Sequence, residues 1–315
     1  MPFRWVVLAA AACLSTAWVP ALAETTASQG VPWVVDLDAG AGHTCALLAD
    51  GNARCWGRNN WGQAGSYGGG DAVQVSAGAG FSCALQRGGD VLCWGRQQGA
   101  WHQHRTFGEG LRPEPARQVA LGSYTAWNGW MGGFVCVLLS ALVRCWDVAG
   151  QAYDLPNSQE AVQLDAGVNH VCWLSSDGSV RCWGILGGTA WHGSRVPLPG
   201  AATQVSAGSW HACARLTTGA VACWGSDAWG NTQGDSAPTT VAVAAGGAHT
   251  CALGVDGNVR CWGHPWLVQG YGGGDAVRLS TGEDHACVLA RTGRVHCWGG
   301  NGDGQATPPP EFAAT

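Results

Sequence analysis

The chain has 315 residues, of which 50 are Gly, 19 are Trp and 15 are Cys, and only 12% are charged. So much Gly excludes a mainly helical protein, because Gly weakens helix interiors, and the 46% apolar content excludes a disordered one. The net charge is −5, Arg is the only basic residue type and no basic run occurs, so the chain lacks the clustered positive charge that nucleic-acid binding needs.

The N-terminus is typical of a secretory signal peptide. Arg4 precedes an apolar run that extends to Leu22, and Ala21-Leu22-Ala23 has the pattern of a cleavage site. Cleavage after Ala23 would leave fourteen cysteines, and we expect residues 24–32 to be a linker. No later stretch reaches about 18 uninterrupted apolar residues, so we expect a secreted, periplasmic or cell-surface protein without a membrane span. A buried element, or a lipid anchor on Cys13, is the alternative interpretation of residues 1–23.

The fourteen remaining cysteines divide the chain into seven repeats. In its fullest form a repeat contains Ala-Gly, then Cys-Ala-Leu, then Cys-Trp-Gly. The cysteine pairs are Cys45 with Cys55, Cys83 with Cys93, Cys136 with Cys145, Cys172 with Cys182, Cys213 with Cys223, Cys251 with Cys261 and Cys287 with Cys297. Units of about 40 residues with a Trp signature and turn glycines are typical of propeller blades. We therefore predict an all-β, seven-bladed β-propeller over residues 33–308, followed by a flexible tail at 309–315.

Each cysteine pair frames a predicted hairpin. In every pair separated by ten positions, the residue after the midpoint is a Gly that can adopt the positive φ of a three-residue hairpin loop; these are Gly51, Gly89, Gly178, Gly219, Gly257 and Gly293. This register places the two cysteines opposite each other, within disulfide range, and predicts one disulfide per blade. Zinc would need more ligands than a hairpin offers, and free thiols are unusual in a secreted protein. The third pair lacks the turn Gly, which leaves its disulfide open.

The first repeat shows a family resemblance. The segments His43–Leu47 and Cys55–Gly57, with the trailing RNNWGQAG at 58–65, resemble the regulator-of-chromosome-condensation repeat family, whose seven-repeat members form seven-bladed propellers. The trailing motif is clear only in the first and seventh repeats. The last one, at 298–308, is similar to that of the secreted bacterial propellers that inhibit β-lactamases. Nuclear members act as nucleotide exchange factors and bind chromatin, a role that the leader, the missing Lys and the acidic balance oppose here.

A histidine lies two positions before the first cysteine in five repeats. The residues at this position are His43, Phe81, Phe134, His170, His211, His249 and His285. Five imidazoles suggest a metal or acid–base site, but Phe in two repeats suits packing better. The family resemblance likewise implies a structural residue between blades, so we predict no metal site.

Tryptophans recur in the loops that follow Cys-Trp-Gly. The candidates for partner binding are Trp61, Trp101, Trp191, Trp229 and Trp266, together with Trp127 and Trp130 in a long insertion between Arg96 and Trp130. If exposed at one rim, they would suit a protein or sugar partner. The alternative is that they cover the gaps between blades.

We find no nucleophile elbow, phosphate loop, metalloprotease motif or carboxylate pair. The sequence thus predicts no catalytic residue and no cofactor. We expect a monomeric binding protein that recognises a protein or glycan, and not a nucleic acid, through Trp-rich rim loops. An inhibitor of a secreted hydrolase such as a β-lactamase, and an enzyme with its active site at the central channel, are the alternatives.

Overall fold

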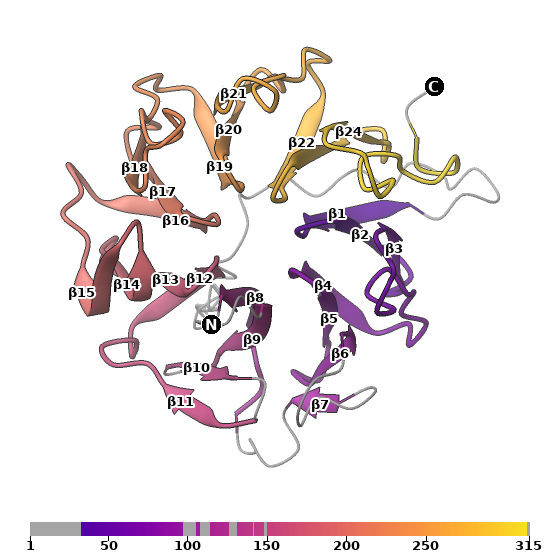
Figure 1. The fold of residues 1–315 in the computed structure, drawn as a ribbon, viewed down its shortest axis with the longest axis horizontal. Helices are drawn as coiled ribbons and strands as arrows, with labels where there is room; N and C mark the ends of the chain where they lie inside the picture. Colours follow the sequence, from indigo (N-terminus) through magenta and orange to yellow (C-terminus); the bar gives the residue numbers. More distant parts are fainter. Residues whose placement is uncertain are drawn as a thin grey trace, which may run out of the picture.

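The computed structural model describes residues 33–96, 105–107, 114–125, 131–140, 142–147 and 150–313. The predicted leader (1–23) and linker (24–32) lie outside these ranges. Seven antiparallel sheets stand around a central channel, and each is one blade of a propeller, as predicted (Figure 1). The described residues include no helix long and apolar enough to cross a membrane.

Each blade is built from one continuous stretch of chain, with its first strand innermost. Blade 1 contains β1 (Val34–Ala39), β2 (His43–Leu48) and β3 (Ala53–Gly57); blade 2 contains β4 (Ala72–Ala77), β5 (Phe81–Gln86), β6 (Val91–Gly95) and β7 (Arg105–Phe107); blade 3 contains β8 (Gln118–Thr125), β9 (Met131–Leu138), β10 (Val143–Trp146) and β11 (Ala152–Asp154). Blade 4 contains β12 (Ala161–Ala166), β13 (His170–Ser175), β14 (Val180–Leu186) and β15 (Thr189–Arg195); blade 5 contains β16 (Ala202–Ala207), β17 (His211–Leu216) and β18 (Val221–Gly225). Blade 6 contains β19 (Thr240–Ala245), β20 (His249–Gly254) and β21 (Val259–Gly263), and blade 7 contains β22 (Ala276–Thr281), β23 (His285–Ala290) and β24 (Val295–Gly299).

The hairpin register is the one that the cysteine spacing predicts. Cys45 pairs directly with Cys55 across β2 and β3, and Gly51 in the turn has a φ of 79°. The predicted disulfide is present in each of the seven blades, with Cα–Cα separations of 4.0–4.1 Å. The bonds join Cys45 to Cys55, Cys83 to Cys93, Cys136 to Cys145, Cys172 to Cys182, Cys213 to Cys223, Cys251 to Cys261 and Cys287 to Cys297. Blade 3, whose disulfide the sequence left open, therefore contains one as well.

The two cysteines of a disulfide differ in how deeply they lie. The first cysteine, on the middle strand of the blade, is 0% exposed in every blade. The second lies one strand further out, and four of the seven are only half-buried: Cys55, Cys223, Cys261 and Cys297. Cys93 of blade 2 is 7% exposed and packs in the cluster between blades 2 and 3. Each bond thus ties the buried middle strand to a strand nearer the outside of the blade.

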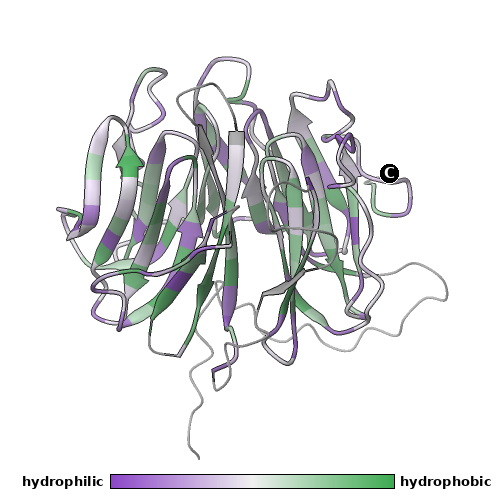
Figure 2. Ribbon diagram, turned by 60° about the horizontal axis from the view of Figure 1, so that its bottom comes forward, coloured by the Kyte–Doolittle hydropathy of each residue, from purple (hydrophilic) through white to green (hydrophobic). Residues whose placement is uncertain are grey.

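Apolar faces of neighbouring blades pack against each other. One cluster joins Leu47 of blade 1 with Val75 and Ala84 of blade 2, and Figure 2 shows hydrophobic stretches along the strands of adjacent blades. At the channel, Gln side chains extend this packing with paired hydrogen bonds. Gln74 Nε2 donates to Val119 O (2.9 Å) and Gln74 Oε1 accepts from Val119 N (3.0 Å).

The fourth strand is reduced in four blades. Single bridges replace it at Ala53–Tyr67, Val221–Asp235, Val259–Tyr271 and Val295–Ala313. Three of these come from the segment that links one blade to the next. The fourth comes from the C-terminus and runs parallel to β24.

The prediction of a flexible tail at 309–315 is therefore wrong for residues 309–313. Phe312 is 1% exposed and packs in the cluster between blades 7 and 1, where its ring centroid lies 6.4 Å from that of Trp56. Arg54 forms an ion pair with Glu311 at 2.8 Å. A short Pro-rich segment looks like a tail in sequence, but its single large apolar side chain fills the outer end of the last boundary between blades.

Candidate partner-binding surface

The turn between the first two strands of a blade and the start of its trailing loop meet at one end of the propeller, as blades 1, 2 and 6 show. Arg58 N, at the start of the first trailing loop, donates to Gly42 O in the turn between β1 and β2 (2.8 Å), and Arg96 N and His264 N bond the equivalent turns in blades 2 and 6. We call this end the loop face; it comprises residues 40–42, 58–65 and their equivalents. Gly is needed in this turn because neighbouring blades come very close together: a Cβ on Gly40 would lie 2.4 Å from Gly78 O.

A buried hydrogen-bond chain fixes the loop that bears Trp61. Ser82 Oγ donates to Gln63 O (2.8 Å), and Trp94 Nε1 donates to the same carbonyl (3.1 Å). Since the Ser82 hydroxyl hydrogen is used in this bond, His43 Nε2, 2.7 Å from Ser82 Oγ, acts as the donor. The His43 imidazole thus anchors the trailing loop of its own blade through a hydroxyl of the next blade.

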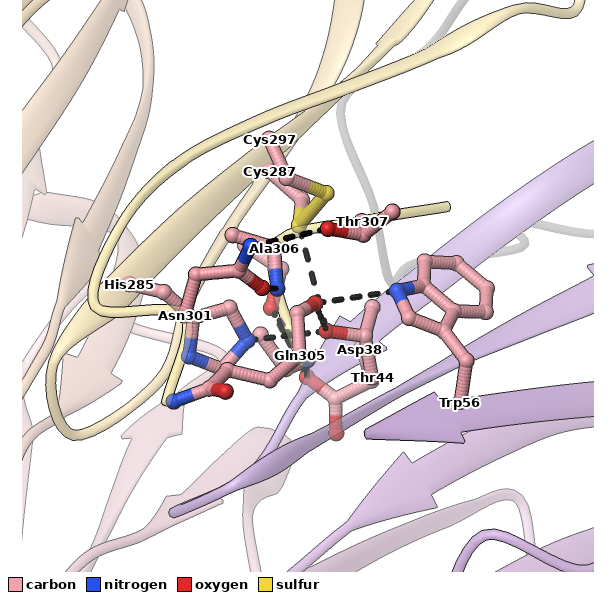
Figure 3. The surroundings of a disulfide bond; sticks show 12 residues. Asp38, Thr44, Trp56, His285, Cys287, Cys297, Asn301, Gln305, Ala306 and Thr307 are labelled. Atoms are coloured by element: carbon pink, nitrogen blue, oxygen red, sulfur yellow. Dashed lines mark hydrogen bonds between the residues drawn. A yellow bond between two sulfur atoms is a disulfide. The ribbon is translucent and has the colours of Figure 1, made fainter. Parts of the chain in front are cut away.

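The same chain occurs at two further boundaries between blades. Thr250 Oγ1 and Trp262 Nε1 donate to Asn231 O, and His211 Nε2 bonds Thr250 Oγ1. At the boundary between blades 7 and 1, Thr44 Oγ1 and Trp56 Nε1 donate to Gln305 O, and His285 Nε2 bonds Thr44 Oγ1 (Figure 3). The blade 5 loop was not recognised in the sequence, because Asp227 and Asn231 stand where the first loop has Asn59 and Gln63. The shared Trp-Gly at 61–62 and 229–230 was the signal that could have identified it.

These loops place Trp61 and Trp229 at equivalent exposed positions. Trp61 is 45% exposed and Trp229 is 54% exposed. Trp61 lies over Gly80 of blade 2, with the Arg96 guanidinium 4.5 Å from its ring centroid. Trp229 contacts His264 of blade 6 at a centroid distance of 4.4 Å and an interplanar angle of 64°.

Blades 5 and 6 carry two more exposed tryptophans on the loop face. Trp266 is 82% exposed, and its ring is 6.1 Å from that of His264. Trp210, which was not among the predicted site residues, is 50% exposed in the turn before His211. Its carbonyl accepts from Ser226 N at the start of the Trp229 loop (2.9 Å). We call Trp210, Trp229, His264 and Trp266 the aromatic cluster.

The remaining predicted site residues are placed differently. Trp191 lies in β15 opposite Gly184 and is half-buried against the core between blades 4 and 5. This position matches the alternative in which a tryptophan covers the gap between two blades. Trp101, Trp127 and Trp130 lie outside the described residues. Of the predicted site residues that the structure describes, the exposed ones are therefore Trp229 and Trp266 on blades 5 and 6 and Trp61 on blade 1.

Carboxylates flank the aromatic cluster. Asp227 starts the Trp229 loop and accepts from Thr232 N (2.8 Å). Glu283 and Asp284 form the adjoining turn of blade 7, where Glu283 O accepts from Gly247 N (3.1 Å). Burial, and then the neighbouring Asp284 carboxylate, raises the pKa of Glu283, whereas Arg58 lowers it. Arg58 itself forms an ion pair with Asp303 at 2.6 Å.

The five histidines that precede the first cysteine of a repeat all lie inside the protein. His43, His170, His211, His249 and His285 are all 0–1% exposed. Burial lowers the pKa of His43 and His211 to about 3 and that of His170 and His249 to about 4, so these four imidazoles are neutral at pH 7. No cluster of three or more metal-ligating side chains occurs in the described part of the chain.

The central channel encloses about 1030 Å³ between the innermost strands. Asp38 and Asp165 line it, and burial raises their pKa values to about 7 and about 6. Each carboxylate bonds the next blade: Asp38 accepts from Ala77 N (2.8 Å), and Asp165 accepts from Ala207 N (2.9 Å). Both therefore serve contacts between blades.

The chain resembles known propellers in sequence and in fold. Five segments match the family model of the regulator of chromosome condensation (RCC1) repeat: residues 34–63, 72–98, 202–232, 241–265 and 276–305. No match was found among curated proteins. The ectodomain of the receptor kinase CR4 from Physcomitrella patens is similar at 19% identity, over 85% of this chain and 74% of that one, with a TM-score of 0.67.

Two further solved structures are similar. The CRINKLY WD40 ectodomain of the receptor kinase ACR4 from Arabidopsis thaliana has 24% identity over 85% of this chain and 98% of its own, with a TM-score of 0.64. Prp20p from Saccharomyces cerevisiae has 17% identity over 88% and 74%, with a TM-score of 0.52. With the repeat matched in blades 1, 2, 5, 6 and 7, the chain is a seven-bladed propeller that contains regulator of chromosome condensation (RCC1) repeats.

Proposed function

We propose that this propeller is a secreted binding protein that recognises a macromolecular partner, in the first place a protein, through the aromatic cluster on its loop face. The observation that carries the proposal is the exposure of Trp210, Trp229 and Trp266 on adjoining blades. Large exposed aromatic side chains are uncommon on monomers and are enriched at the energetic centres of interfaces.

The rigidity of the Trp229 loop supports this proposal. A side chain held in place before binding loses little conformational entropy when a partner arrives. The buried chain from His211 through Thr250 to Asn231 O holds the loop from below, and Asp227 closes it by accepting from Thr232 N.

Similar propellers support a role in binding. Two of them are ectodomains of receptor kinases, and the description of Prp20p names binding to Gsp1p and histones. Seven disulfides are in keeping with an oxidising compartment, as is the predicted leader. We therefore place this chain outside the cytoplasm, on the cell surface or secreted.

The proposal assigns no enzymatic activity to the channel. The channel carboxylate of Asp38 is engaged in contacts between blades, because its two oxygens accept hydrogen bonds from Ser280 Oγ (2.9 Å) and from Ala77 N (2.8 Å). A secreted hydrolase is one class of partner that could bind the loop face. In that case, binding would inhibit the hydrolase.

The test is capture of partners from the native source with the full mature protein and two variants. Trp229→Ala combined with Trp266→Ala should abolish capture of the partner, because it removes the two ring surfaces at the centre of the cluster. Tyr153→Ala is the matched control: Tyr153 is also an aromatic residue with 50% exposure, but it lies on the outer strand β11. Equal capture by all three proteins, each shown to be folded, would contradict the proposal.

A further inference from the structure

The protein contains an internal example of what the exposed Trp position can bind. In blades 1 and 2, Trp61 has the Arg96 guanidinium 4.5 Å from its ring centroid, which is within cation–π range. Arg96 directly follows Gly95 at the end of β6. The loop geometry therefore presents a Trp face to which a guanidinium can stack.

Blades 5 and 6 repeat this geometry without the guanidinium. Trp229 occupies the position of Trp61, and His264, which follows Gly263 at the end of β21, occupies the position of Arg96. An imidazole is not a permanent cation. The rings of Trp229 and Trp266, which both contact His264, therefore lack the guanidinium that Arg96 supplies to Trp61. These rings remain largely exposed.

The loop segments around the aromatic cluster contain carboxylates and no Arg or Lys. Residues 208–210, 226–234, 246–248, 264–270 and 282–284 make up this sector of the loop face, and they contain Asp227, Glu283 and Asp284 but no Arg or Lys. The bordering guanidinium groups are each paired with another carboxylate: Arg58 pairs with Asp303 and Arg260 pairs with Asp235. The sector thus offers aromatic faces, which attract cations, within a negative rim.

We infer that the aromatic cluster takes a positively charged segment of its protein partner, with an Arg side chain stacked on Trp229 or Trp266 and with the carboxylates of Asp227, Glu283 and Asp284 close by. This inference rests on the proposed function and specifies its partner. A guanidinium is the cation of choice, because it is planar, weakly hydrated and stacks on aromatic rings. An uncharged glycan would gain nothing from the negative rim, and a second copy of this chain has a net charge of −5.

The test uses synthetic peptides of one length, with three Arg spaced by Gly and Ser, against the same peptide with citrulline or Glu at those positions. Citrulline keeps the shape of Arg and removes its charge. Binding of each fluorescent peptide to the full mature protein is followed by anisotropy up to about 1 mM, because single exposed cation–π contacts are weak. We expect the Arg peptide to bind at least tenfold more tightly than the citrulline peptide, and the Glu peptide not to bind.

Three variants locate the site. Trp229→Leu keeps an apolar side chain but removes the π face, and should weaken binding of the Arg peptide about fivefold. Asp227→Asn should weaken it about threefold without disturbing the loop, since Asn59 and Asn301 occupy the same position and cap their loops in the same way. His264→Arg should also weaken it, because the new side chain would cover Trp229 as Arg96 covers Trp61. Tyr153→Ala should bind like the unmodified protein.

Two outcomes would overturn the inference: equal affinity for the Arg and citrulline peptides, or no binding of the Arg peptide up to the highest concentration. Loss of partner capture in the Trp229→Ala, Trp266→Ala protein would still uphold the proposed function in either case. Sedimentation of the protein alone tests a third outcome, in which the loop face joins two copies of the chain. A dimer formed through this face would also overturn the inference.

Discussion

At the scale of single residues, the position two residues before the first cysteine of each repeat shows what the sequence can predict and what it cannot. The presence of Phe at this position in two of seven repeats predicts a side chain that packs in the interior, and the five histidine side chains are indeed buried. The sequence could not reveal that His43, His211 and His285 each donate to a hydroxyl of the next blade, because Ser82, Thr250 and Thr44 become neighbours only through the propeller. His249 differs: neither of its ring nitrogens has a hydrogen-bond partner within the described part of the chain.

His249→Phe should therefore make the protein more resistant to acid. Burial lowers the pKa of His249 to about 4, below the unfolded value, so the unfolded chain takes up a proton first and stability is lost as the pH falls from about 6.5 towards 4. Phe81 shows that a phenyl ring fits this position. We expect the variant to gain about 1 kcal/mol at pH 7.5, where a buried unsatisfied imidazole is removed, and about 2 kcal/mol more at pH 5.

Urea unfolding at both pH values measures this difference, with Val255→Ala as a control. Val255 is 69% exposed and carries no titratable group, so its variant should follow the unmodified protein. An equal effect of His249→Phe at pH 7.5 and pH 5 would show that this imidazole does not titrate differently on folding.

At the scale of strands and loops, local chemistry predicted the hairpins and missed their edges. Positive φ at Gly51 and its equivalents sets the turn, and the turn sets the register that joins the cysteines. The fourth strands are weak in sequence because a single bridge, such as Ala53–Tyr67, leaves no alternating pattern. The position of Trp191 could not be predicted for a related reason: spacing from Cys182 does not distinguish a loop from the paired strand β15 that blade 4 forms there.

The C-terminal segment is such an edge, and Phe312→Ala should loosen it. Phe312 is 1% exposed between blades 7 and 1, and loss of a buried phenyl ring typically costs about 3 kcal/mol or more. The free energy of unfolding in urea, with disulfides intact, should fall by about this amount. Val255→Ala should change it by less than about 0.5 kcal/mol. A change in Phe312→Ala as small as that of the control would mean that the segment does not contribute to stability.

At the scale of the whole molecule, the propeller closes through side chains. Blade 7 is one continuous stretch of chain, and it joins blade 1 where Thr44 and Trp56 donate to Gln305 O (Figure 3). Ala39 N also donates to Ser280 Oγ there. Repeat counting predicted seven blades but could not predict this closure, since its partners are about 240 residues apart. A closed ring gives the loop face a fixed shape, and the three exposed tryptophans of blades 5 and 6 are its most prominent apolar feature.

Hydrogen–deuterium exchange of the protein with and without its captured partner tests this account most directly. If the aromatic cluster is the binding surface, residues 226–234 and 264–270 should gain protection on binding, while the outer strand β11 and the channel strands β1 and β12 should not change. Protection confined to the channel strands, or to the turns at the opposite end such as residues 254–258, would contradict the central claim that this propeller binds through its loop face.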